Sequence, residues 1–245
     1  MDVLLLRFSA PLMSFGSSAT VDRVLRTSAF PTLSMLTGLL GNALGYKHTD
    51  FDRLESLQSS LHFASRRDFG GRVVADYQTI DLGQEFMLDE AAWTTWGELQ
   101  KRAGGSDNRV GTHQRWKDYL HSSCFTLAVS LRGPTVETMA SIRDALKSPA
   151  RPLFLGRKCC LPDRPLFLAA ESASSLRGAV LNAPLPHLPS GLSKVPGLGR
   201  CVWWPEGDSL PGEEARKIRL VDCRDWRNQI LVGSRTVYEE ALHDA

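Results

Sequence analysis

Short apolar runs separated by polar segments define the first 170 residues. Val3–Phe8 is an apolar run that Pro11 follows closely, and it suits a buried strand because it is too short for a helix. Pro31 then starts a segment whose apolar positions recur at helical spacing, which predicts a helix up to about Gly45. These positions are Leu33, Leu36, Leu40, Ala43 and Leu44.

Further alternation predicts more strands downstream. Leu61–Arg66 reads as a strand, and Gly70 and Gly71 are expected to turn it into a hairpin with a second strand beginning at Arg72. Cys124–Leu131 is another strand. The segment after it predicts a helix with Val136, Met139, Ile142 and Leu146 on one face, and Leu166–Ala170 closes the series as a strand.

This order of strands and helices predicts the α+β class, as a ferredoxin-like or RRM-like sandwich of one sheet backed by two helices. The domain would comprise residues 1–77 and 112–170. Residues 78–111 are polar, carry Trp93 and Trp96, and are expected to form an insertion. Residues 171–245 predict a small C-terminal β-rich lobe, because prolines and glycines crowd 184–212 and short strand candidates follow.

The overall composition is that of an ordinary folded protein and excludes a disordered chain. The 245 residues are 42% hydrophobic and 23% charged, as in folded globular proteins, and 29 Lys and Arg against 27 Asp and Glu give a net charge of +2. The apolar runs are shorter than the ~18 residues of a membrane span, and the N-terminal run is too short for a secretory signal. We therefore expect a cytoplasmic protein with no membrane partner. The five cysteines include no C-x-x-C pair, so no metal site is expected. We expect no cofactor either.

Charge is concentrated in one loop. From Arg143 to Arg164 there are six basic and two acidic residues, a local balance of +4. Within this stretch, Gly156 stands beside Arg157 and Lys158. A glycine next to two cations lets a phosphate backbone approach the main chain, which is typical of nucleic-acid binding. A solvated basic helix end explains the same residues without a ligand.

Two other features suggest close contacts. Gly38, Gly41 and Gly45 fall at i, i+3 and i+7 of the predicted first helix, where each interior glycine costs about 1 kcal/mol relative to alanine. Packing of a strand on the helix explains the stripe, and a bound phosphate backbone is the alternative. Four of the six tryptophans, Trp93, Trp96, Trp203 and Trp204, suit either protein interfaces or the core.

A polar segment around position 115 carries candidate catalytic groups. A helical reading of Thr112–Tyr119 puts His113 and Lys117 one turn apart. A histidine base and a lysine charge would suffice for metal-independent RNA cleavage, whereas the same residue types also bind phosphates and stack bases. Binding is favoured, because no second acid or base is paired with His113. The sequence contains no G-x-S-x-G, Walker, G-x-G-x-x-G or H-E-x-x-H motif, and it lacks the aromatic RRM signature.

Several separated motifs, in order, resemble the CasD family, the Cas-five-type subunit of the type I-E CRISPR complex Cascade, within the RAMP superfamily. The resemblance covers nearly all of positions 3–168, and the C-terminal third matches loosely around Ser234–Tyr238. The longer insertion and the proline-rich segment 184–212 depart from the family pattern. The matching motifs are Leu4–Gly16, Arg26–Thr27, Phe30–Gly45, Asp76–Thr79, Thr112–Leu120, Phe125–Thr126 and Pro152–Cys160.

The resemblance implies a non-catalytic RNA-binding subunit that grips the repeat-derived 5′ handle of crRNA and caps the backbone filament in antiviral defence. Its implied partners are the Cas-seven-type backbone subunit, the Cas-eight-type large subunit and, indirectly, target DNA. Residues 78–111 would form a thumb against the neighbouring backbone subunit. The residues expected at the RNA are Ser14, Phe15, Gly16, Arg26, Ser34, Tyr77, Arg109, Arg115, Lys117, Gly156, Arg157 and Lys158.

Two alternatives stay open. Type I-C relatives use the same fold as a repeat-cleaving endoribonuclease, so a metal-independent enzyme acting through His113, Lys117 and Tyr119 is the second hypothesis. The third is a β-rich protein-interaction module with incidental basic loops, whose RNA affinity would be weak and indifferent to sequence.

Overall fold

The computed structural model describes residues 1–16, 24–81, 91–93, 99–101, 112–133, 135–187 and 199–242. Their helices are α1 (Leu33–Ala43), α2 (Phe51–Ser60), α3 (Met139–Lys147) and α4 (Leu176–Asn182). Their strands are β1 (Asp2–Met13), β2 (Val24–Leu25), β3 (Leu61–Phe69), β4 (Arg72–Asp81), β5 (Ala91–Trp93), β6 (Leu99–Lys101), β7 (Thr112–Leu131), β8 (Phe167–Ser172), β9 (Cys201–Pro205), β10 (Arg216–Asp225) and β11 (Ile230–Ala241).

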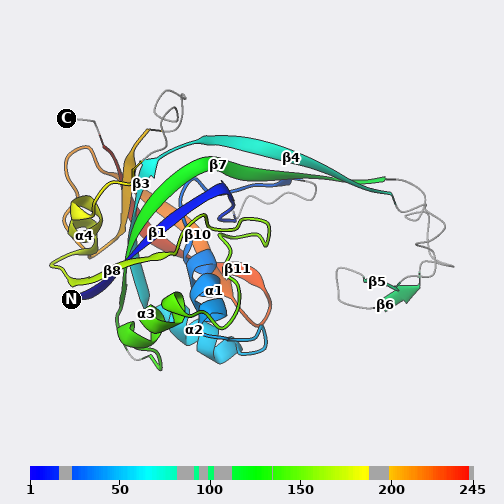
Figure 1. Ribbon diagram of the computed structural model, residues 1–245, viewed down its shortest axis with the longest axis horizontal. Helices are drawn as coiled ribbons and strands as arrows, with labels where there is room; N and C mark the ends of the chain where they lie inside the picture. The colour runs from blue at the N-terminus through cyan, green and yellow to red at the C-terminus, as the bar shows by residue number, and fades with distance from the viewer. Residues whose placement is uncertain are drawn as a thin grey trace.

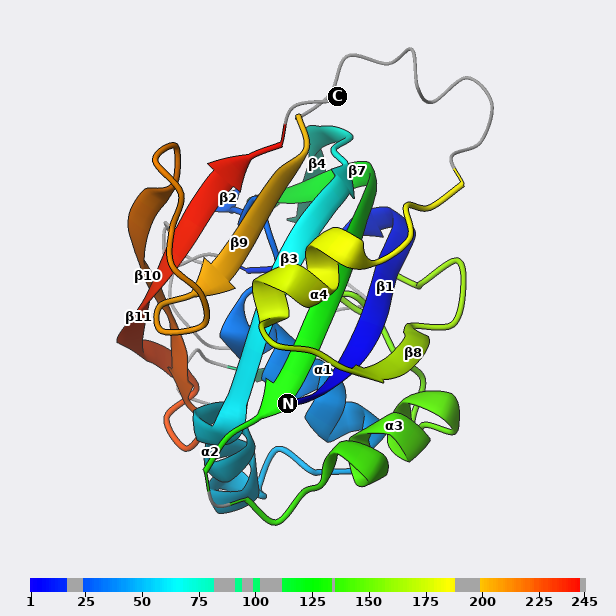
Figure 2. The ribbon, with the colours of Figure 1, turned by 90° about the vertical axis from the view of Figure 1, so that its left-hand side faces the viewer.

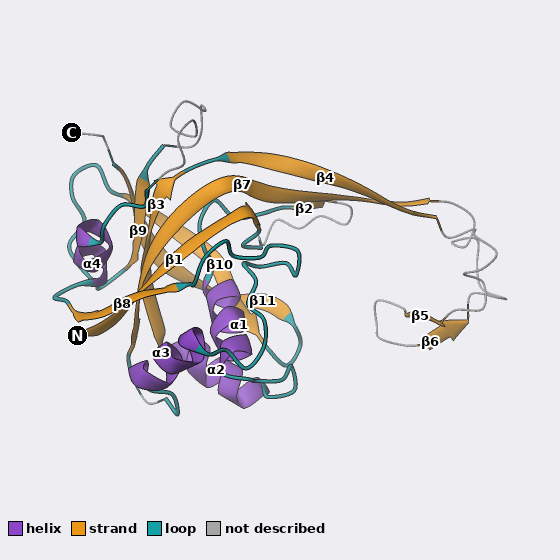
Figure 3. Cartoon of the chain, viewed as in Figure 1, coloured by secondary structure: helices purple, strands orange, loops and turns teal. Residues whose placement is uncertain are grey.

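Most strands of the described residues belong to one sheet in the order β10-β11-β9-β3-β7-β1-β8. All neighbours along this path are antiparallel, and only the short β2 pairs in parallel, with β7. Figure 1 shows α1, α2 and α3 on one side of the sheet and α4 on the other, and Figure 3 shows the same view by element type. The predicted α+β class is confirmed.

Strand β7 forms pairs along both edges over its 20 residues. Along one edge it pairs with β1, from Leu4 opposite Val129 to Met13 opposite Leu120, and then with β2. Along the other edge its C-terminal half pairs with β3 and its N-terminal half with β4. The predicted strand 124–131 is therefore the inner half of a longer strand.

The hairpin predicted at Gly70–Gly71 is wrong. β3 and β4 do not pair with each other but follow one another along the same edge of β7, with Phe69 opposite Cys124 and Arg72 opposite His121. At the junction the chain presses against β7, and a Cβ on Gly71 would stand 1.6 Å from the carbonyl oxygen of His121. Glycine is therefore required for a close crossing rather than for a tight turn.

The outer halves of β4 and β7 form a two-stranded ribbon that projects from the body and leads to the short β5–β6 pair (Figure 1). The helix considered for Thr112–Tyr119 is therefore also wrong, because this segment is the start of β7. Its main-chain groups pair with β4 from Asp81 opposite Thr112 to Val74 opposite Tyr119. This tertiary pairing overrides the weak helical spacing of a polar segment.

The apolar run Val3–Phe8 is buried on both faces, as expected of a central strand. Leu4, Leu6 and Phe8 join the core formed with α1, α2 and α3, whereas Val3 and Leu5 pack with α4. Figure 2 shows α4 lying across that second face. The first predicted helix is confirmed as α1, and the helix predicted after residue 134 is confirmed as α3 with Ile142 and Leu146 buried.

A buried ion pair fixes α4 to the sheet. Arg66 Nε donates to Asp68 Oδ1, and both side chains are almost fully buried. The guanidinium also donates to the carbonyls of Leu181 and Ala183 at 3.0 Å, and Asp68 accepts the hydroxyl of Thr126 from β7. Since the C-terminal carbonyls of a helix lack intrahelical partners, Arg66 satisfies groups that burial would otherwise leave unpaired.

The strands predicted in the C-terminal third are present as β9, β10 and β11, but they form no separate sheet. β9 pairs with β3 and thereby extends the main sheet. Trp203 and Trp204 are 2% and 0% exposed, so these two tryptophans belong to the core and not to an interface. Trp203 packs in the core formed with α1, α2 and α3, whereas Trp204 packs in the core formed with α4. Aromatic side chains bury large apolar areas, so β9 contributes to both faces of the sheet. Within the described residues, no helix has the length and apolar character needed to cross a membrane.

We expect Gly71→Ala to destabilise the fold by roughly 1–3 kcal/mol, because β4 and β7 would have to separate to admit the methyl group. Urea denaturation measures the free energy of unfolding. Gly212→Ala is the matched control, since a Cβ there meets only Glu240, at 3.8 Å. Equal stabilities of the two variants would contradict the close crossing at Gly71.

Candidate nucleic-acid interface

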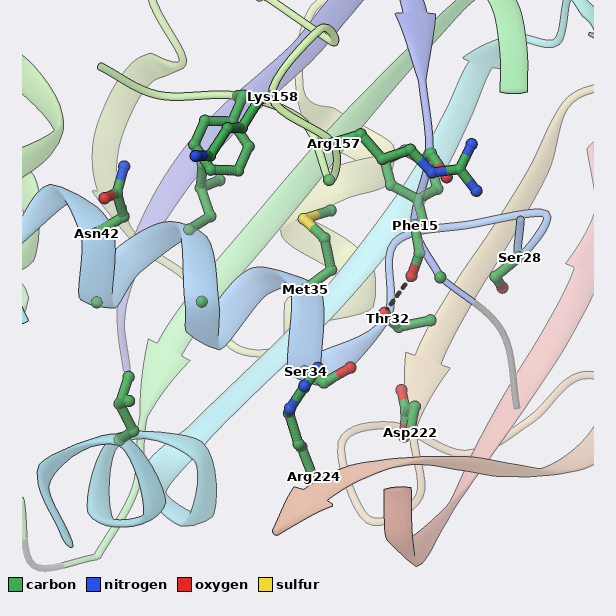
Figure 4. A pocket seen from close by; sticks show the side chains of 18 of the residues that line it. Phe15, Ser28, Thr32, Ser34, Met35, Asn42, Arg157, Lys158, Asp222 and Arg224 are labelled. Carbon is green, nitrogen blue, oxygen red and sulfur yellow. Dashed lines mark hydrogen bonds between the residues drawn. The ribbon is translucent and has the colours of Figure 1, made fainter. Parts of the chain in front are cut away.

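A groove of about 1120 Å³ opens beside α1. Its walls are α1 itself, the loop of residues 151–161, the segment after β1 and the ends of β10 and β11. Figure 4 shows Met35 in the middle of this groove, with Lys158 on one side and Arg224 on the other. The lining between the charged groups is apolar and includes Leu39, Phe154 and Leu161.

Positive charge dominates the groove. Among the described residues its lining contains one carboxylate, that of Asp222, which is already paired with Arg235 at 2.9 Å. Six basic side chains stand against this one paired acid, whereas the whole chain carries only +2. Such a concentration of cations attracts polyanions. The six are Arg26, Lys47, Arg151, Arg157, Lys158 and Arg224.

The basic loop is held against the end of β1 by main-chain contacts. Ser14 N donates to the carbonyl of Leu155 at 3.0 Å, and Leu155 N donates to that of Cys160 at 2.8 Å. Gly156 has a φ of +99°, and a Cβ there would stand 1.5 Å from the carbonyl oxygen of Ser14. Gly156 is therefore needed because the basic loop and the main chain of Ser14 approach each other closely at this point.

Arg157 braces the groove wall. Its Nη1 donates to the carbonyl of Asp118 at 3.0 Å and its Nη2 to that of Leu25 at 2.9 Å, while its guanidinium lies 4.5 Å from the ring centre of Tyr119. These contacts tie the loop to β2 and β7 and use much of the donor capacity of this arginine. Lys158, the next residue, is exposed. The two neighbouring cations therefore differ in role.

Arg151 is also committed to the protein. Its Nε donates to Asn42 Oδ1 at 2.8 Å, and its Nη2 donates to the carbonyl of Tyr46. These contacts join the loop to the C-terminal end of α1. Arg26, Lys47 and Lys158 are instead exposed at the groove rim. They are the cations best placed to meet phosphates without breaking an internal contact.

Eight of the twelve residues expected at the RNA line this groove. The side chain of Phe15 is nevertheless 1% exposed and packs edge-on against Phe125 at 5.3 Å. Its carbonyl accepts the hydroxyl of Thr32 at 2.6 Å. Ser14 is buried too, so its hydroxyl and the Phe15 ring belong to the wall rather than to a base-stacking surface. The eight are Ser14, Phe15, Gly16, Arg26, Ser34, Gly156, Arg157 and Lys158.

The other four expected residues lie away from the groove lining. Lys117 and Arg115 are on the ribbon, where Lys117 Nζ donates to Gln78 Oε1 at 2.6 Å. Tyr77 is directly opposite Trp116, with ring centres 5.0 Å apart. Because neighbouring strand positions face opposite ways, Tyr77 lies on the other face of the ribbon from Lys117. Arg109 lies outside the described residues.

The catalytic alternative is not supported by proximity. Four strand positions separate His113 from Lys117, or about 13 Å between their Cα atoms instead of one helical turn. Tyr119 is buried, its hydroxyl lies 3.5 Å from Cys159 Sγ, and burial followed by that hydrogen bond raises its pKa. A phenol with a raised pKa is a weak proton donor near neutral pH. In the described part of the chain, no three His, Cys, Asp or Glu side chains gather to hold a metal ion.

The glycine stripe has a mixed explanation. Gly41 permits helix-on-helix packing, because a Cβ there would stand 2.7 Å from Leu54 of α2. A Cβ on Gly38 would stand 3.5 Å from the Trp226 ring, and both Gly38 and Gly41 line the groove. Gly45 follows the end of α1 with a φ of +84° and is the residue that terminates the helix. The strand-on-helix packing that the sequence favoured is not the contact observed.

Several groove residues were not singled out from the sequence. Lys47 and His48 lie beyond the C-terminal end of α1, separated from it by three residues, so a search of the segment after the helix for basic residues would have found them. Asp222 and Arg224 come from β10 and reach the groove only because the sheet brings the C-terminal third back to α1. No local motif marks them.

A family model and a curated relative match most of this chain. The family model described as "CRISPR-associated protein (Cas_Cas5)" matches residues 3–238. The protein "CRISPR system Cascade subunit CasD" of Escherichia coli (strain K12) is 30% identical over 186 residues, which are 73% of this chain and 75% of that protein.

Two solved structures share the fold. A chain of a "CRISPR RNA-guided surveillance complex" superposes with a TM-score of 0.65 at 24% identity, covering 98% of this chain and 89% of that one. A second, described as "Crystal structure of Cas protein", gives a TM-score of 0.52 at 22% identity, covering 98% and 94%.

The antiparallel sheet and these matches define a CRISPR-associated protein of the RAMP type. More narrowly, the chain belongs to the Cas5 family, and its resemblance to the CasD proteins of type I-E systems is confirmed.

Arg157→Ala is expected to lower the free energy of unfolding by about 1–3 kcal/mol, because it deletes charged hydrogen bonds to the carbonyls of Leu25 and Asp118. Lys158→Ala, the adjacent control, removes an exposed cation and should stay within about 0.5 kcal/mol of the parent protein. Chemical denaturation followed by tryptophan fluorescence provides both values. A Lys158→Ala variant as unstable as Arg157→Ala would contradict the assigned roles.

Proposed function

We propose that this protein is a non-catalytic RNA-binding subunit of a type I-E Cascade surveillance complex, and that its groove receives the repeat-derived 5′ handle of crRNA. The observation that carries the proposal is the groove beside α1, in which six basic side chains of the described residues face one carboxylate that is already neutralised. Membership of the Cas5 family supports RNA as the polyanion.

The form of the groove favours a single strand over a duplex. Exposed cations at the rim, including Arg26, Lys47 and Lys158, would neutralise phosphates, while the apolar lining around Met35 and Phe154 suits unpaired bases. Fixed main-chain contacts between Ser14 and Leu155 keep the loop in place before RNA binds. A preformed site lowers the entropy cost of binding.

The finer architecture belongs to the same proposal. β1, α1, β3, β7, α3 and β8 would form the ferredoxin-like unit, because their strands neighbour one another in the order β3-β7-β1-β8 with antiparallel pairs throughout. The β4–β7 ribbon and the insertion it carries would act as the thumb. Arg115 and Lys117 would then extend the basic surface outward from Arg157 along one ribbon face.

The partners follow from the family. A curated relative is described as a Cascade subunit and a structural neighbour comes from a surveillance complex, which supports assembly with Cas-seven-type and Cas-eight-type subunits. The protein would cap the backbone filament, act in the cytoplasm, serve antiviral defence and meet target DNA only through the assembled complex.

Lys158→Ala and Arg26→Ala should each weaken binding of the handle RNA and reduce the slope of log affinity against log salt by roughly 0.7 to 1, as one phosphate contact is lost. The measurement is a fluorescence-anisotropy titration of labelled repeat RNA at several salt concentrations. Arg143→Ala is the control, because Arg143 lies on α3 outside the groove and binds Asp144 at 2.8 Å. Unchanged slopes in both groove variants would contradict phosphate contact at the rim.

Labelled repeat RNA incubated with the protein in EDTA should stay intact on a denaturing gel while it is bound in the titration. Specific cleavage that disappears in His113→Ala or Lys117→Ala would establish the endoribonuclease instead. Micromolar affinity that is the same for a scrambled RNA would favour the protein-interaction module.

A further inference from the structure

The wall of the groove opposite the basic loop comes from the end of the β10–β11 hairpin. Arg224 and Trp226 line the groove there, near the start of α1. In Figure 4 the Arg224 side chain rises from β10 toward Ser34, on the opposite side of Met35 from Lys158. This part of the chain resembled the CasD family only loosely in sequence, so the family motifs assign it no role.

Arg224 is held in place by its main chain. Its N–H donates to Gln58 Oε1 at 3.0 Å, and its carbonyl accepts Gln58 Nε2 at 2.9 Å. Gln58 belongs to α2, so this double contact fixes the hairpin to the helical layer. The side chain is placed independently, by Nη2, which donates to the Gln229 carbonyl at 3.0 Å and to Gln229 Oε1 at 2.8 Å.

Donor groups at this wall exceed the acceptors that meet them. Arg224 Nε is buried and has no hydrogen-bond partner among the described residues. Trp226 is 5% exposed, and its Nε1 is likewise buried without a partner within the described chain. Most buried polar groups in proteins are hydrogen-bonded, and each exception needs an explanation. These two donors are enclosed by protein, so the part of this wall that can meet an acceptor in the groove is the partly exposed Arg224 guanidinium.

The charge at this wall is uncompensated. The one carboxylate in the described lining of the groove, that of Asp222, accepts Arg235 Nε and Nη2 at 2.9 to 3.1 Å and the N–H of Leu33 at 2.9 Å. It is therefore neutralised from behind the groove. The Arg224 guanidinium lies 5.5 Å from the Trp226 ring centre, which supports a cation without cancelling its charge.

We propose that Arg224, supported by Trp226, forms a second anion subsite of the groove and takes a phosphate oxygen of the strand whose other phosphates meet the rim at Lys158. The inference rests on the proposed function and extends it. A strand bound in this way is contacted from both walls, so the C-terminal hairpin is part of the RNA site. Phosphate contacts from two sides fix the register of the strand, which one row of cations does not.

The test is a methylphosphonate scan of the handle RNA, in which one phosphate at a time loses its charge. Methylphosphonate at one phosphate position should lower the affinity of the parent protein by roughly tenfold to a hundredfold. Arg224→Gln should bind the unmodified RNA more weakly by a similar factor. The same methylphosphonate should then cause no further loss of affinity in this variant. A different position should show the same relation with Lys158→Gln. Arg219→Gln is the control, because Arg219 is an exposed cation of the same strand that donates to Ser234 Oγ at 2.9 Å outside the groove.

The possible results distinguish failure of the proposed RNA-binding function from failure of the Arg224 subsite alone. Failure of the parent protein to bind the handle would overturn the proposed function together with the subsite. Binding that depends on Lys158 but is the same in Arg224→Gln and Arg219→Gln would overturn the subsite alone. The subsite would also be overturned if the affinity lost in Arg224→Gln were coupled to the identity of one base and to none of the methylphosphonate positions, because Arg224 would then contact a base and not a phosphate. Trp226→Phe keeps an aromatic ring beside Arg224 but removes the indole N–H and one of the two fused rings, and it should weaken binding less than Arg224→Gln.

Discussion

Pairing of β7 along both of its edges is the constraint on which the remaining structure depends. One edge holds β1 and β2, and the other holds β3 and then β4, so the body and the projecting ribbon share a single strand. A two-stranded ribbon is marginally stable by itself in water. It persists here as the continuation of a sheet whose inner half is buried on both faces. The close crossing at Gly71 is what allows β3 and β4 to follow the same edge without a gap.

The groove depends on the same strand through Arg157. This side chain contacts the carbonyl of Asp118 and the ring of Tyr119, both on β7, and the carbonyl of Leu25 on β2. The loop therefore sits where the body gives way to the ribbon. Arg115 and Lys117 lie beyond this point on one face of the ribbon, opposite Gln78 and Asp76.

Local pattern was sufficient for much of the fold. The apolar run of β1, the periodicity of α1 and the basic loop with Gly156 were predictable, since each is encoded within a short segment. Strand partners were not, because pairing between β4 and β7 joins segments whose alternation does not specify a neighbour. Helix α2 was missed although Phe51, Leu54 and Leu57 recur at helical spacing. The C-terminal wall was missed because Asp222 and Arg224 reach the groove only through the order of the sheet.

Basic residues in the loop do not all have the same function, and the sequence alone does not separate them. Arg151 and Arg157 donate hydrogen bonds to main-chain carbonyls and to the side-chain amide of Asn42. Their positive charge therefore adds to the electrostatic potential of the groove, while their side chains hold its wall in place. Lys158 has a flexible stem and stands exposed, which suits a phosphate whose position varies. Arg151 and Arg157 thus shape the site and raise its potential, whereas the side chain of Lys158 remains available to a ligand. The local excess of charge that first drew attention to the loop is therefore partly structural, which explains why a basic run by itself is a weak predictor of a binding site.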